Sequence, residues 1–157
     1  MRSVEATLAV MHTQLSCKVY GEQPEAAIEA AFAEVKRLEL LLSRFLPDSE
    51  VSSINGQAGN GLVDVSPDTI EVLQEAVAVG ALSSGAFDVT IAPLMNLWDF
   101  THAAIPPTQA AINEVRSRVD YRQIRLDVKN RRAGLGEQGM MLDLGGLAKG
   151  YAVDRAK

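Results

Sequence analysis

The chain has 157 residues, a formal net charge of −5 at pH 7, 47% apolar residues and one cysteine. Its length suits one domain or a part of something larger, and its apolar content excludes a disordered chain. The acidic balance argues against a nucleic-acid binder, which needs concentrated Lys and Arg. One cysteine excludes a disulfide framework and a cysteine-rich zinc site.

No apolar run approaches the length of about 18 residues that a membrane span needs. The first residues carry an acid early and show no apolar segment typical of a signal peptide. We therefore expect no membrane span and a cytoplasmic protein, or a cell-envelope protein if an export signal has been trimmed.

Apolar spacing predicts a strand and then helices in the first half of the chain. Near-alternate apolar residues predict one strand over 7–20. From Pro24, apolar residues three or four apart predict a long helix whose apolar stripe reaches Phe45 and which Pro47 ends. The later elements are marked by cap and turn residues: a helical turn over 48–55, a strand over 62–65 and a helix from Ser66–Pro67 to Gly85.

The second half mixes strands with helices. The expected elements are a strand-like run after Asp88, a helix from about Thr108, strands over 124–128 and 132–135 joined by a turn, a strand over 140–144 and a helix at the end. Antiparallel hairpins among helices favour an α+β fold with a largely antiparallel sheet over a doubly wound parallel sheet.

Two segments carry residue types suited to a ligand. Segment 84–98 combines small residues, an aromatic residue and an acid, so a ligand could approach the backbone and hydrogen-bond to Asp88. A purely structural interpretation also stands, with Gly85 ending a helix and Phe87 buried.

Segment 142–150 places an acid, paired glycines and a helix start in succession. This arrangement suits a phosphate, because N–H groups at a helix start face outward and Lys149 adds a positive charge. Its spacing matches neither the Walker nor the Rossmann pattern, and a structural turn remains an alternative. Among other candidates, His12 and His102 are too few for most histidine metal sites, and Cys17 fits a small buried apolar position.

Together, segments 85–98 and 143–154 resemble the ApbE family, the FAD:protein FMN transferases. Shorter matches occur in the same order along the chain: Met11-His12-Thr13, Ser43-Arg44-Phe45, Pro47, Ser49-Glu50 and Asn55. The resemblance runs from about Met11 to the last residue. It implies an enzyme that binds FAD and Mg²⁺, transfers FMN to a threonine of an acceptor protein and releases AMP; some members hydrolyse FAD instead.

The resemblance also assigns site residues. It implies flavin or nucleotide contacts at Met11, Phe45, Ala86, Phe87, Asp88, Asp143 and Lys149, and a Mg²⁺ ligand in the carbonyl of Gly146. Two positions depart from the family pattern: Phe45 stands where tyrosine is frequent, and His12 stands where glycine is expected.

The family's members are longer, so the resemblance leads us to expect that residues 1–157 correspond to the N-terminal portion of an ApbE-like domain, without the C-terminal half that carries further Mg²⁺ ligands. No catalytic residue is assigned for this reason. A non-catalytic flavin-binding module and an inactive fragment are the alternatives. Strands starting at Ile124 and Met140 would then lack partners, which predicts a homo-oligomer through an exposed edge or disorder toward the C-terminus.

Overall fold

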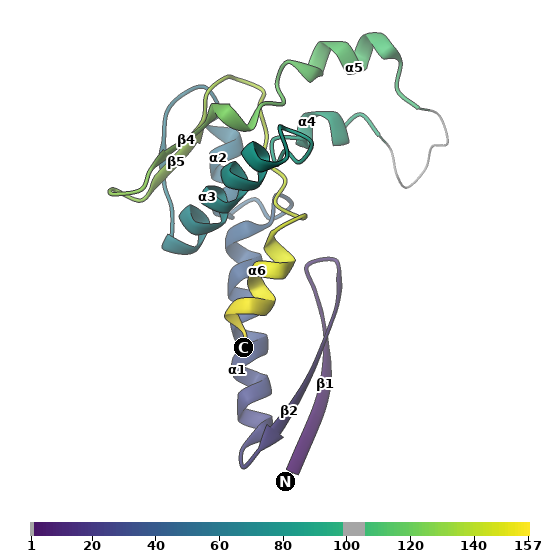
Figure 1. Cartoon of the computed structure of the whole chain (residues 1–157), viewed down its shortest axis with the longest axis vertical. Coiled ribbons are helices and arrows are strands. Elements are labelled where there is room, and N and C mark those ends of the chain that lie inside the picture. Colours follow the sequence, from purple (N-terminus) through teal and green to yellow (C-terminus); the bar gives the residue numbers. More distant parts are fainter. Residues whose placement is uncertain (1, 99–105) are drawn as a thin grey trace.

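The computed structural model describes residues 2–98 and 106–157. Its long axis is set by helix α1 (Pro24–Leu42), with the hairpin of β1 (Arg2–Val10) and β2 (Thr13–Gly21) beside one half of it (Figure 1). The remaining helices and a small sheet gather around the other end of α1, and the C-terminal helix α6 (Ala148–Arg155) lies along α1. No helix of these residues is both long and apolar enough to span a membrane.

Helix α1 follows its apolar stripe but ends earlier than the stripe predicts. A proline occupies its first turn, and Ile28, Val35, Leu38 and Leu42 are buried along one face. At Ser43 the backbone becomes extended (φ −78°, ψ 126°). The predicted helix over Phe45 is therefore wrong, and that ring is 61% exposed instead of continuing the buried face.

The single strand predicted over 7–20 is also wrong, since the structure has a hairpin. Residues Met11 and His12 form its two-residue turn, with Val10 opposite Thr13. The less exposed side chains lie at even-numbered positions in β1 and at odd-numbered positions in β2, because the two-residue turn pairs even positions of β1 with odd positions of β2.

The other end of α1 carries an antiparallel sheet with the strand order β3-β5-β4, packed on helices α2 and α3. The bounds are α2 (Glu50–Gly56), β3 (Val63–Asp64), α3 (Pro67–Leu82), β4 (Ile124–Asp127) and β5 (Arg132–Leu135). Ser49 and Ser66 cap α2 and α3 through side-chain oxygens, as their sequence context predicts. The α+β class and the largely antiparallel sheet are thus confirmed.

Segment 140–144 is not a strand, and neither is the run after Asp88. Among the described residues, the two segments share only one isolated parallel bridge, between Ile91 and Met141. The run leads into a short helix, α4 (Ala92–Met95). Helix α5 (Gln109–Arg116) begins after its cap residue Thr108. A 3₁₀ turn, η1 (Tyr121–Gln123), precedes β4. Segment 140–144 is apolar because it crosses the core, where Leu142 and Leu144 are fully buried. It therefore presents no sheet edge, and the C-terminal residues form α6 instead of the expected disorder.

A polar cluster joins α1, α3 and α6. The buried Asp68 carboxylate accepts hydrogen bonds from Arg37 Nη1 at 3.0 Å and from the Tyr151 hydroxyl at 2.9 Å. Burial alone would raise the pKa of Asp68, but the hydrogen bonds from Arg37 and Tyr151 and the nearby guanidinium groups outweigh burial and lower that pKa.

Gly80 in α3 is expected to reject alanine. A Cβ at this position would lie 2.7 Å from Cγ of the Tyr121 ring. Gly80→Ala should therefore lower the free energy of unfolding by about 1–3 kcal/mol, although alanine favours helices. Gly150→Ala in α6 is the control, because its Cβ meets nothing within 4 Å and should raise stability by about 0.5–1 kcal/mol. Urea denaturation measures both, and a Gly80→Ala protein as stable as the parent would contradict the packing.

Asp68 should make stability depend on pH in acid. The pKa of Asp68 in the folded protein lies below the ordinary aspartate value of 3.8, so its stabilising contribution is complete well above that pH and is lost as pH falls through the folded pKa. The difference in unfolding free energy between the parent and Asp68→Asn should shrink below pH 3.8. Asp48→Asn, at an exposed turn, is the control. If the difference in unfolding free energy between the parent and Asp68→Asn stays constant from neutral to acid pH, the stabilising role of the Asp68 carboxylate is contradicted.

Candidate functional site

The eight residues that the resemblance assigns all line one cleft of about 1150 Å³. They are Met11, Phe45, Ala86, Phe87, Asp88, Asp143, Gly146 and Lys149. The turn after β1, the end of α1, the segment before α4 and the loop before α6 contribute to it. Ligand pockets commonly measure about 300–1,000 Å³, so a dinucleotide-sized molecule fits this space.

An ion pair joins two walls of the cleft. Nε of Arg44 donates to Oδ2 of Asp143 at 2.7 Å, and both side chains are largely buried, at 14% and 16% exposed. Nη1 of Arg44 donates to the side chain of Asn96 at 3.0 Å. A charge-assisted hydrogen bond therefore connects segments that are 99 residues apart in sequence. Such a bond is stronger than one between neutral groups.

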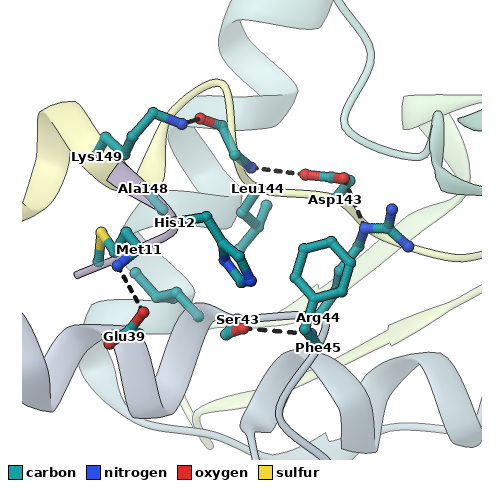
Figure 2. A pocket seen from close by; sticks show the side chains of 12 residues that line it. Met11, His12, Glu39, Ser43, Arg44, Phe45, Asp143, Leu144, Ala148 and Lys149 are labelled. Carbon is teal, nitrogen blue, oxygen red and sulfur yellow. Dashed lines mark hydrogen bonds and ion pairs between the residues drawn. The ribbon is translucent and has the colours of Figure 1, made fainter. Parts of the chain in front are cut away.

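Aromatic and cationic groups are stacked beside this pair. The guanidinium carbon of Arg44 lies 4.3 Å from the centroid of the Phe45 ring, within the range of a cation–π contact. The His12 ring lies 5.0 Å from the same ring, with a 60° angle between planes. Figure 2 shows the His12 and Phe45 rings side by side in a smaller pocket that adjoins the cleft.

The glycine loop is shaped by Asp143 and Lys149. Oδ1 of Asp143 accepts the Gly145 amide at 2.8 Å, and Lys149 Nζ donates to the Gly145 carbonyl at 2.5 Å (Figure 2). Helix α6 follows without a side-chain cap. The Ala148 amide donates to the Leu144 carbonyl at 2.8 Å, whereas the amides of Lys149 and Gly150 have no partner among the described residues and can donate to an anion. The loop can therefore hold a phosphate by its backbone and one lysine.

Phe87 brings the two matched segments, 85–98 and 143–154, into direct contact. Its ring lies against Gly146, where a Cβ would approach Cε2 of Phe87 to 2.9 Å. The second glycine of the loop therefore leaves the space that the Phe87 ring occupies.

The Asp88 carboxylate is already engaged by the chain. Oδ1 accepts the amide and the hydroxyl of Thr90 at 2.8 and 2.7 Å, and Oδ2 accepts the Tyr121 amide at 2.8 Å. These bonds fix the segment that carries Ala86 and Phe87 along the cleft. Asp88 therefore positions this segment through its hydrogen bonds to Thr90 and Tyr121.

The described residues do not make a complete magnesium site. They contain no group of three or more His, Cys, Asp or Glu side chains arranged to hold a metal. Asp143, the acid nearest the glycine loop, is paired with Arg44. The Gly146 carbonyl alone cannot satisfy a cation that prefers six oxygen ligands.

Three residues that build the site, Arg44, Asn55 and Asn96, had no predicted role. All three stood inside matched segments, which was a usable signal. The Asn55 side chain accepts the Leu142 amide at 2.7 Å and donates to the Leu142 carbonyl at 3.2 Å, which replaces the strand partner expected for segment 140–144. Cys17 is half-buried on β2 outside the cleft, and His102 lies outside the described residues.

Comparison with protein families finds a match to the ApbE family over residues 11–157. Curated relatives include the FAD:protein FMN transferases of Treponema pallidum, 34% identical over 93% of this chain, and of Klebsiella pneumoniae, 33% identical over 94%. The matches cover 43% and 47% of those proteins, so the chain spans about half the length of its curated relatives.

Solved structures agree with this match. The ApbE protein from Thermotoga maritima superposes with a TM-score of 0.89 at 32% identity, over 99% of this chain and 51% of that one. The flavin transferase ApbE from Vibrio cholerae also reaches 0.89, over 99% of this chain and 52% of its own; at 24% identity it supports the fold alone.

Asn55 should be needed for stability. Asn55→Ala removes both side-chain hydrogen bonds to the buried Leu142 backbone and should cost about 2–4 kcal/mol in unfolding free energy. Asn55→Asp keeps the acceptor but loses the donor, so its cost should be intermediate. Asn60→Ala, at an exposed position, should change stability by less than about 0.5 kcal/mol. Equal urea midpoints for Asn55→Ala and the parent would contradict this role.

Proposed function

The chain belongs to the ApbE family, and from this membership we propose that it carries the flavin-nucleotide site of an FAD:protein FMN transferase. In the proposed reaction a threonine hydroxyl of an acceptor protein attacks the phosphorus on the FMN side of the FAD pyrophosphate. A new O–P bond forms, the bond to AMP breaks, and the hydroxyl proton is released. The acceptor keeps FMN through a phosphoester.

One observation supports this function above the others. Residues implied as flavin contacts come from four distant segments and line the same cleft. The cleft offers an exposed aromatic ring at Phe45 for a planar ring and a glycine loop with Lys149 for phosphates. These two features match two kinds of group in FAD, its aromatic heterocycles and its pyrophosphate.

We also propose that Mg²⁺ takes part, with the Gly146 carbonyl as the ligand from this chain. A bound divalent cation would neutralise charge on the pyrophosphate oxygens. Its remaining ligands would come from outside the described residues, and we assign no step to it. A homo-oligomer likewise stays a prediction, since β4 lies at one edge of its sheet.

FAD titration of the 157-residue chain tests the binding site. Saturable quenching of flavin fluorescence is expected, and Lys149→Met should raise the Kd about tenfold because it removes one charge-assisted contact. Lys129→Met, in the turn between β4 and β5, is the matched control and should leave the Kd unchanged. An absence of saturable binding by the parent would contradict the site.

Transfer distinguishes the enzyme from its alternatives. The chain is incubated with FAD, Mg²⁺ and a threonine-containing acceptor peptide, and flavin fluorescence that persists on the peptide after denaturation reports transfer. Binding without transfer would favour a non-catalytic flavin-binding module. If the chain shows no FAD binding and no transfer, the inactive-fragment alternative is favoured.

A further inference from the structure

The turn between β1 and β2 holds two side chains at the cleft in an unfavourable backbone conformation. Met11 has φ 51° and His12 has φ 57°. This left-handed region is open to glycine but sterically unfavourable for residues with a Cβ, although histidine enters it more often than most. Such strain persists only where the surrounding structure maintains it, and it concentrates at functional sites.

Helix α1 maintains this turn. Oε1 of Glu39 accepts the Met11 amide at 2.6 Å, which fixes the tip of the hairpin on the last turns of the helix. The hydrogen bond uses the backbone of Met11 and makes no use of the His12 side chain. The stability of the turn therefore gives no reason for an imidazole at position 12.

The His12 side chain instead completes an exposed stack. Its ring lies 5.0 Å from the Phe45 ring in a tilted arrangement, and the Arg44 guanidinium lies 4.3 Å from the centroid of Phe45. Tilted aromatic pairs at this distance are attractive. Both His12 and Phe45 are exposed, so the pair belongs to the cleft wall and not to the core. In Figure 2 the imidazole points into the pocket toward Phe45.

We propose that His12 is a specificity-determining residue that forms, with Phe45, an aromatic platform for a planar heterocycle of FAD. The inference rests on the proposed function, because it takes FAD as the ligand. FAD contains two such heterocycles, the flavin and adenine rings, and both have the flat π-face that stacking requires.

A role in binding and a role in the turn predict different FAD affinities for His12→Gly. Glycine removes the backbone strain, so the Tm should stay equal or rise by up to about 4 °C. Loss of the imidazole should raise the Kd for FAD about threefold to tenfold. A residue that served only the turn would give a more stable protein with unchanged affinity.

Arg131→Gly is the matched control. Arg131 also has a left-handed backbone (φ 52°), at the exposed turn between β4 and β5 and outside the cleft. Arg131→Gly should lose the same kind of backbone strain and show a similar change in Tm, while its Kd for FAD stays unchanged. His12→Phe keeps an aromatic face and should hold the Kd within about twofold of the parent.

FAD, FMN and AMP titrations of the parent and the three variants, with thermal melts, test the inference. Weaker FAD binding by His12→Gly alone supports it, and whether FMN or AMP shows the same loss identifies the stacked ring. Equal FAD affinity in the parent and His12→Gly overturns the inference but leaves the proposed function standing. A loss in His12→Phe as large as in His12→Gly also overturns it. No FAD binding by the parent overturns both.

Discussion

The ion pair between Arg44 and Asp143 is the interaction on which the geometry of the cleft depends. Arg44 follows the end of α1, and Asp143 precedes the glycine loop, so the pair fixes the distance between the aromatic wall and the phosphate-binding wall. Charges with so little solvent access are costly unless each is paired. The same guanidinium also holds Asn96 and stacks on Phe45, which ties a third wall to the first two.

The pairing also explains how an acidic chain can offer a site to an anionic dinucleotide. Among the described residues, the two carboxylates that line the cleft are both engaged: Asp143 by Arg44 and the Gly145 amide, and Asp88 by Thr90 and Tyr121. The Lys149 ammonium, which also donates to the Gly145 carbonyl, and the Lys149 and Gly150 amides in the first turn of α6 can face a ligand. Local neutralisation of this kind makes the net charge of −5 compatible with the proposed pyrophosphate ligand.

Local signals in the sequence were enough for the α+β class and for every longer helix, but not for the short helix α4, where a strand-like run was expected. Ser66 before Pro67 and the apolar stripe of α1 act within a few residues, so caps and periodicity predicted them. The turn at Met11–His12 was missed because neither residue is typical of a two-residue hairpin turn, which favours Asn-Gly. Segment 140–144 was misassigned because burial makes it apolar while its hydrogen bonds go to the Asn55 side chain and to Val89. The site residues followed from motifs, but contacts across about a hundred residues leave no local signal.

A double-mutant cycle on Arg44 and Asp143 tests most directly whether this pair assembles the cleft. Unfolding free energies are measured in urea for the parent, Arg44→Met, Asp143→Asn and the double variant. We predict that each single change is destabilising and that the double variant costs less than the sum of both by at least about 1 kcal/mol. Effects that add within about 0.3–0.5 kcal/mol would show that the two side chains act independently and would contradict the account.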